Sequence, residues 1–138
     1  MTRFWITLDQ GVNLVLFALK AMHGGEIFVP KIPSMRITDL ASAIASECKI
    51  KIIGIRPGEK LHEVLLTDDE TSRTFDVGDV LTIRPQFQFM TRDDVWIQGK
   101  LLPEAFRYTS DTNDRWLTAS ELQSMVEELE GKEESAQI

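Results

Sequence analysis

Two oppositely charged residues, Arg56 and Glu59, lie three positions apart in the run Arg56–Glu63. The planar guanidinium of arginine matches phosphate oxygens, whereas a carboxylate repels phosphate but accepts hydrogen bonds from sugar hydroxyls. The pair therefore suits a nucleoside diphosphate. The same spacing also allows Arg56 to be a solvated residue at a strand end and Glu59 to do no more than favour a helix dipole. The spacing alone leaves both interpretations open.

The segments on either side of this pair predict a turn from a strand into a helix. Residues Ile50–Ile55 are mostly apolar, which is typical of a buried strand, and the apolar residues after Lys60 recur at helical spacing. Pro57 suits the first position of a helix, and Gly58 lets another group approach the backbone closely. Arg56 would then lie at the carboxyl end of a strand and beside a helix N-terminus, whose free N–H groups favour phosphate.

The remaining elements are expected from capping boxes and from apolar periodicity. The predicted helices cover residues 8–22 after a Thr7–Gln10 capping box, 38–48 with Thr38 as N-cap, and 119–130 between a Thr118–Glu121 capping box and Gly131. The predicted strands cover residues 26–29, 74–77 and 80–83, and the last two are joined across Gly78 and Asp79. Residues 86–100 have no assignable pattern. This alternation predicts an α/β fold in a single domain over residues 1–138, with residues 131–138 as a frayed tail.

Composition and charge limit the classes of function. A net charge of −7 over 138 residues speaks against general nucleic-acid binding, which requires a basic surface. No apolar run approaches the roughly 20 residues of a membrane span, and residues 1–5 do not resemble a signal peptide. The single cysteine excludes an internal disulfide and fits a reducing compartment. A cytoplasmic protein without membrane or nucleic-acid partners is expected.

The residue types needed for several common reactions are missing or wrongly spaced. The eight glycines include no Gly-x-Gly-x-x-Gly or Gly-x-x-Gly-x-x-Gly set, which a nicotinamide cofactor would require. The only tyrosine, Tyr108, is followed four residues later by Thr112, so no Tyr-x-x-x-Lys pair exists. His23, His62 and Cys48 lack the spacing of metal ligands. The sequence thus predicts a binding site without catalytic residues, metal ligands or a cofactor site.

Four stretches, Met1–Asp9, Gly24–Leu40, Ile55–Glu63 and Phe106–Asn113, together resemble one family and keep its order. They are similar to the C-terminal half of the UDP-N-acetylglucosamine 4,6-dehydratases, lyases that belong to the extended short-chain dehydrogenase/reductases. These enzymes serve surface polysaccharide, capsule and flagellin-glycan biosynthesis of the pseudaminic acid type. The resemblance covers nearly the whole chain and is weakest over residues 86–100.

The resemblance implies a C-terminal substrate-binding lobe that lacks most of the Rossmann domain. In the family, that domain holds NADP and the catalytic residues, and the smaller lobe grips the UDP-sugar. By resemblance, Arg3 and Arg56 would clamp the diphosphate from two sides, and Glu59 would meet the ribose. This chain would therefore bind a UDP-sugar but hold neither NADP nor catalytic residues.

Three hypotheses follow from these observations. The first is the UDP-sugar-binding portion of a 4,6-dehydratase, truncated or split and inactive in isolation. The second is a non-catalytic module that binds a nucleotide-sugar or docks on a full-length relative. The third is an interaction domain that self-associates through an exposed apolar face, expected at Phe4 and Trp5. A Rossmann-domain partner or a second copy would cover that face.

Overall fold

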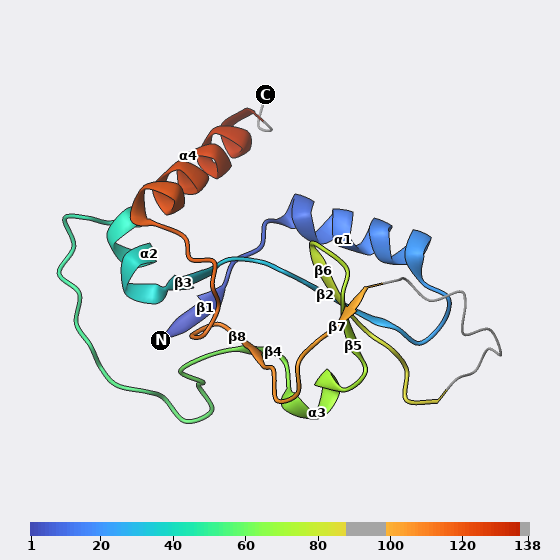
Figure 1. Cartoon of the computed structure of the whole chain (residues 1–138). Helices are drawn as coiled ribbons and strands as arrows, with labels where there is room; N and C mark the ends of the chain where they lie inside the picture. The colour runs from blue at the N-terminus through green and yellow to red at the C-terminus, as the bar shows by residue number, and fades with distance from the viewer. Residues whose placement is uncertain (88–98, 136–138) are drawn as a thin grey trace. The chain divides into compact units, whose positions relative to one another are not determined.

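The computed structural model of the protein describes residues 1–87 and 99–135 (Figure 1). The chain divides into two compact units, each assembled from segments that are far apart in the sequence. Unit 1 comprises Met1–Trp5, Pro33–Glu63 and Ser110–Ile138, and unit 2 comprises Ile6–Ile32 and Val64–Thr109. A single domain over residues 1–138 stays a prediction. No helix in the described ranges combines the length and the apolar character that crossing a membrane requires.

Unit 1 combines a two-stranded antiparallel sheet with two helices. Its elements are β1 (Thr2–Phe4), β3 (Ser34–Arg36), α2 (Ile37–Ile44) and α4 (Ala119–Ser135). β1 pairs with β3, and α2 packs against α4 (Figure 1). Met35, Leu117 and Leu122 form the core between these elements. Burying side chains of this size stabilises the fold by about 1.5–3 kcal/mol each.

Trp5 packs against this core, and both Trp5 and its neighbour Phe4 are partly buried rather than exposed. The expectation that Phe4 and Trp5 form an exposed apolar face is therefore wrong. The most exposed of the large apolar side chains lie instead on α1 and in residues 50–55, where Leu8 is 84% exposed and Ile52 is 86% exposed.

Unit 2 is built around a four-stranded antiparallel sheet. Its elements are α1 (Leu8–Ala21), β2 (Ile27–Pro30), β4 (Val64–Leu66), α3 (Asp68–Thr71), β5 (Thr74–Asp76), β6 (Val80–Ile83), β7 (Lys100–Leu101) and β8 (Tyr108–Thr109). The sheet has the order β2-β6-β5-β7, and β4 pairs separately with β8. Val29, Leu81 and Ile83 are buried in it. The rings of Phe17 on α1 and Phe28 on β2 meet edge to face with centroids 5.7 Å apart.

Both long helices begin as the capping boxes predict. Thr7 Oγ1 accepts a hydrogen bond from the Gln10 N–H, and the Gln10 side chain accepts one from the Thr7 N–H. Thr118 and Glu121 make the same reciprocal pair before α4. The predicted end at Gly131 is wrong, because α4 continues to Ser135. The frayed tail over residues 131–138 stays a prediction. Residues 136–138 lie outside the described part of the chain.

The hairpin predicted across Gly78 and Asp79 is confirmed, since β5 and β6 pair antiparallel. Gly78 has a φ of 87°, a conformation that L side chains rarely adopt, and the Asp76 carboxylate accepts from its N–H at 3.0 Å. Lys31 Nζ lies 2.6 Å from the same Asp76 oxygen, and this contact lowers the pKa of the Asp76 carboxyl below its ordinary value. Most of the unassigned range 86–100 lies outside the described residues.

The predictions around residues 38–60 are largely wrong. The second helix has Arg36 rather than Thr38 as its N-cap, two residues earlier than predicted, and it ends at Ile44 rather than near Cys48. Residues 49–55 form no strand, and no helix follows Pro57. Val64–Leu66 instead form β4, because their backbone pairs with β8. Apolar residues at helical spacing can also belong to a short strand beside a turn.

Every strand pair between the named strands is antiparallel. The fold is a mixed α/β arrangement with small sheets, so the α/β prediction is confirmed in outline. The placement of Arg56 at the carboxyl end of a strand is wrong, since the last described element before it is α2, which ends at Ile44. Arg56 and Glu59 therefore lie on a turn and not at the end of a strand.

Candidate functional site

Arg56 and Glu59 are the two ends of one tight turn. The Glu59 N–H donates to the Arg56 carbonyl at 3.0 Å, and Gly58 has a φ of 86°. A proline at the second position and a glycine with positive φ at the third define a type II turn. The turn, rather than a helix N-terminus, brings the arginine and the carboxylate together.

The two side chains differ in their partners. A Glu59 carboxylate oxygen accepts the Arg56 N–H at 2.9 Å, which closes the turn a second time. A carboxylate has two oxygens and about four acceptor sites, so Glu59 can still accept from a hydroxyl group. Within the described residues, the exposed Arg56 guanidinium has no hydrogen bond or ion pair. It is available to an anion.

Arg3 of β1 lies against the residues that follow this turn. Its Nη2 donates to the Lys60 carbonyl at 2.9 Å, and its Nη1 donates to the carbonyls of Thr2 at 2.7 Å and Leu61 at 3.3 Å. Its Nε lies 3.3 Å from a carboxylate oxygen of Glu63. The guanidinium therefore binds groups of the protein itself, and a contact between Arg3 and a diphosphate stays a prediction.

A buried cluster of hydroxyl groups also holds residues 61–63, and sequence reasoning missed it. Thr2 Oγ1 lies 2.8 Å from His62 Nδ1 and 2.7 Å from Ser110 Oγ, which also accepts the Glu63 N–H at 2.8 Å. The Thr2 N–H donates to the Leu61 carbonyl, and the Ser110 N–H donates to the Glu63 carbonyl, each at 2.9 Å. Ser110 falls in a stretch that only the family resemblance had singled out.

The N-termini of α1, α3 and α4 are poorly suited to the pyrophosphate of NADP. At α1, α3 and α4 the side chain of the preceding threonine or the third helical residue occupies the first free N–H groups. At α3 and α4 that third residue is a glutamate, which would repel phosphate. These three N-termini do not fit the cofactor, and its absence from this chain stays a prediction. In the described ranges there is also no group of three or more metal-ligating side chains.

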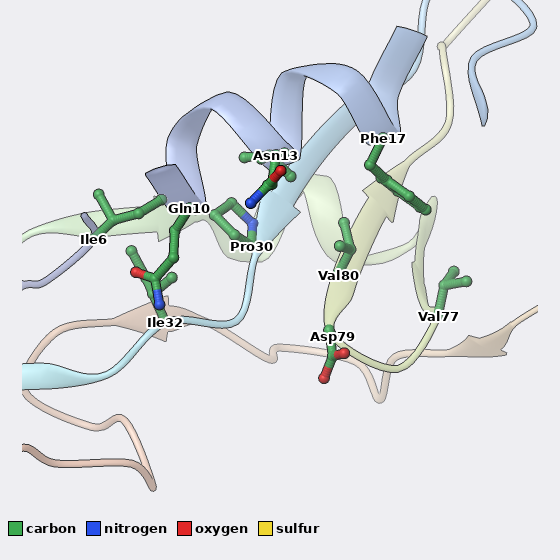
Figure 2. A pocket seen from close by; sticks show the side chains of 10 residues that line it. Ile6, Gln10, Asn13, Phe17, Pro30, Ile32, Val77, Asp79 and Val80 are labelled. Atoms are coloured by element: carbon green, nitrogen blue, oxygen red, sulfur yellow. The ribbon is translucent and has the colours of Figure 1, made fainter. Parts of the chain in front are cut away.

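Unit 2 has a shallow hollow of about 520 Å³ between α1 and the β5–β6 turn. Figure 2 shows Gln10 and Asn13 of α1 and Asp79 of the turn around an otherwise apolar lining. Among the described residues, Asp79 is the only charged one that lines it, and no described cation does. The described lining therefore holds no group that would balance a phosphate, and neither Arg56 nor Glu59 belongs to it.

Comparison with known proteins identifies the family of this chain. A model of the family described as polysaccharide biosynthesis protein matches residues 1–85, which include β1, the Arg56–Glu59 turn and the β5–β6 hairpin. The chain belongs to this family. The match contains all three predicted site residues but does not extend to Ser110.

Relatives within and around the polysaccharide biosynthesis family extend the similarity over nearly the whole chain. The chain is 44% identical to a UDP-N-acetylglucosamine 4,6-dehydratase (inverting) from Campylobacter jejuni over 95% of its own length and 41% of that relative. It is 34% identical to a UDP-glucose 4-epimerase from Rickettsia canadensis, covering 91% of the chain and 38% of that relative. The resemblance to the dehydratases is thus confirmed, and the chain spans about two fifths of the relatives that it matches.

A solved structure shows the same fold. The X-ray structure of Pen from Bacillus thuringiensis superposes with a TM-score of 0.71 at 30% sequence identity. The superposition covers 91% of this chain and 37% of Pen. Together with the epimerase and dehydratase relatives, this neighbour identifies the chain as part of a short-chain dehydrogenase/reductase-like protein.

Proposed function

We propose that this chain is the UDP-sugar-binding portion of a UDP-N-acetylglucosamine 4,6-dehydratase of surface glycan biosynthesis. The observation that carries the proposal is the similarity to two kinds of enzyme. One is named a dehydratase and the other an epimerase, so they differ in reaction, but both names contain a UDP-sugar. The chain matches both over more than nine tenths of its length. The part of the two enzymes that this chain matches is therefore best explained by binding of the UDP-sugar that both names contain.

The Arg56–Glu59 turn is the part of the chain that suits this ligand. The exposed guanidinium would hold two oxygens of the diphosphate, and the Glu59 carboxylate would accept from a ribose hydroxyl. The two groups start from opposite ends of one turn, so one nucleotide can reach both. The lobe would supply one wall of a cleft, and we expect weak binding, with dissociation constants of about 1 mM.

The reaction itself would need groups from outside this chain. The family's NADP and catalytic residues belong to a Rossmann domain, and the N-termini of α1, α3 and α4 are closed by their own side chains. We therefore propose that the chain is inactive alone and acts in the cytoplasm as the C-terminal substrate-binding lobe of a longer or two-part enzyme. The exposed apolar residues of α1 and of residues 50–55 would be covered by that partner.

The same exposed residues favour a second candidate, a non-catalytic module that docks on a partner or on a second copy. A titration separates the two. In the first candidate, UDP perturbs the NMR signals of residues 56–63, and Arg56→Ala weakens binding about tenfold or more, because a charge-assisted hydrogen bond is lost.

Lys60→Ala is the matched control, since Lys60 is a neighbouring exposed cation outside the turn. It should weaken binding less, because an ammonium is a mobile point charge that cannot fork onto two oxygens. Glu59→Gln should also cost less than Arg56→Ala, since an amide oxygen still accepts from a hydroxyl. Signals that move elsewhere, or an affinity that Arg56→Ala leaves unchanged, would contradict the assignment.

A further inference from the structure

Residues 49–55 have the composition of a strand but no strand partner in the described part of the chain. Four of the seven are isoleucine, a β-branched residue that favours strands, and each of the four is more than half exposed. The whole connection from α2 to β4, residues 45–63, contains no helix or strand (Figure 1). The run therefore has the apolar character of a buried strand but lies open to solvent.

The backbone of this run is as open as its side chains. No N–H or carbonyl of residues 49–55 forms a hydrogen bond with another described residue. Side chains alternate along an extended strand, so one face of the run would be apolar throughout, and the other would begin with Lys49 and Lys51. Both the main chain and an apolar face are thus available to a neighbouring strand.

The charges near the run indicate which kind of strand would fit beside it. Residues 49–60 carry four cations and one carboxylate, although the whole chain has a net charge of −7. A second copy in parallel register would set Lys49 and Lys51 against their own counterparts, and like charges directly opposite each other destabilise a strand pair. An antiparallel pair of copies would still bring two basic segments together in an isolated ribbon of marginal stability. An edge strand of another sheet, with neutral or acidic side chains, meets neither objection.

The relatives that this chain matches contain further sequence from which such a strand can come. The chain covers 41% of the Campylobacter jejuni dehydratase, so about three fifths of that relative lie outside the match. The family model includes residues 49–55 within its match to residues 1–85. The run thus belongs to the matched part, and a partner strand can be supplied by the unmatched part.

We propose that residues 49–55 are a strand whose partner is an edge strand in the part of the longer enzyme that this chain does not match. The statement rests on the proposed function, in which the chain is one lobe of a longer or two-part enzyme. Main-chain hydrogen bonds would hold the added strand, and its alternate side chains would select the partner, as in other cases of strand addition to a sheet edge.

Pairing would also fix the Arg56–Glu59 turn, which directly follows the run. The residues after the turn are already held by backbone hydrogen bonds to Thr2 and Ser110. The residues before it, 49–55, have no such bond among the described residues. A strand pair that ends at Ile55 would hold the turn from its free side. A nucleotide on the turn and the partner strand would therefore stabilise each other, because coupling between two sites is reciprocal.

The first test compares amide hydrogen exchange in two proteins without nucleotide. One is this chain alone, and the other is an intact hybrid in which this chain replaces the matched two fifths of the Campylobacter jejuni dehydratase. In the chain alone, the amides of residues 50–55 should exchange as in an unfolded peptide. In the hybrid, at least every second one of them should exchange about tenfold or more slowly, because alternate N–H groups of a strand bond to its partner.

The second test uses two neighbouring prolines and their matched controls. Adjacent N–H groups point to opposite edges of a strand, so at least one of Ile52→Pro and Ile53→Pro removes a bond to the partner. In the hybrid, that variant should lose the slowed exchange and bind UDP about tenfold more weakly. Ile52→Val and Ile53→Val keep the N–H and the β-branched shape and should do neither. In the chain alone, the proline variants should leave UDP binding unchanged, because there the run has no partner to lose.

The exchange results decide whether the run is a strand and which partner it has. The Leu117 amide, bonded to the Ser34 carbonyl at 2.8 Å, reports on the fold of unit 1 and should be equally slow in both proteins. Free exchange of residues 50–55 in a hybrid whose Leu117 amide is slow overturns the proposal. Slowed exchange of alternate amides in the chain alone, growing with its concentration, assigns the run to a second copy and overturns it too. If the hybrid does not fold, the intact dehydratase gives the same reading at the residues that align with 49–55.

The UDP results separate this proposal from the proposed function. If the hybrid binds UDP and neither proline variant weakens the binding, the link between the strand and the turn is overturned. If neither the chain nor the hybrid binds UDP at any concentration, the proposed function fails, and the exchange rates alone decide whether residues 49–55 pair with the partner.

Discussion

Removing the hydroxyl of Tyr108 should measurably destabilise unit 2. Tyr108 is buried on β8, and its hydroxyl accepts the Ile32 N–H at 2.9 Å and donates to the Ile32 carbonyl at 2.8 Å. One oxygen thus satisfies both backbone groups of a residue just beyond β2. Tyr108→Phe keeps the ring and removes these two bonds.

The cost follows from the two bonds that are lost. Each is worth about 1 kcal/mol net, and both lie in partly buried surroundings that water reaches only in part. We expect a loss of about 2 kcal/mol in the free energy of unfolding. For a chain of this length, that lowers the melting temperature by about 8 °C.

Thermal and urea unfolding followed by circular dichroism would measure the change. Ser46→Ala is the control, because it removes an exposed hydroxyl whose partner, the Glu47 carboxylate, lies at 3.5 Å. It should change stability by less than about 0.5 kcal/mol. Tyr108→Leu should cost more than Tyr108→Phe, because the buried ring is lost too. A Tyr108→Phe variant as stable as the wild type would refute the reasoning.

Three further predictions concern acid stability, the cofactor and association. The hydrogen bond from Lys31 lowers the pKa of Asp76 from 3.8. The pair therefore stabilises the fold above about pH 4, and this stability is lost as the pH falls through the lowered pKa. Because both side chains are about one-third exposed, Asp76→Asn should flatten the acid limb of a pH–stability curve by no more than about 1 kcal/mol. NADP should not bind the isolated chain, and saturable binding in a calorimetric titration would contradict this. The chain should self-associate through its exposed apolar residues, and sedimentation should show Ile52→Lys to be more nearly monomeric than the wild type, with Lys51→Arg as the unchanged control.

The elements that sequence predicted well carry their information locally. The α1 and α4 starts follow from capping boxes in which the threonine and the third helical residue bond each other, and the hairpin follows from a glycine with positive φ. These features need only a few neighbouring residues. A single sequence is sufficient to identify them.

The failures concern residues whose conformation is set from far away. The apolar residues after Lys60 fit a helix, but the Leu61 carbonyl bonds Thr2 and the Val64–Leu66 backbone pairs with β8. Likewise, the sequence singled out Arg56 and Glu59 from their spacing, but it could not show that a buried serine 47 residues beyond Glu63 holds the chain next to them. Serine is normally an exposed residue, and only the tertiary contacts give Ser110 its role.

The exposed isoleucines of residues 50–55 affect how copies of the protein behave toward one another. Among the described residues this β-branched run pairs with no strand, so its backbone and side chains remain open to other chains. Short runs of this kind, with few charges and no proline, are the segments from which amyloid-like stacks grow. Lys49 and Lys51 interrupt the run at one end, and Gly54 interrupts it near the other. These three residues act as gatekeepers, because stacking identical copies would bring the lysine charges into register and leave a gap at each glycine.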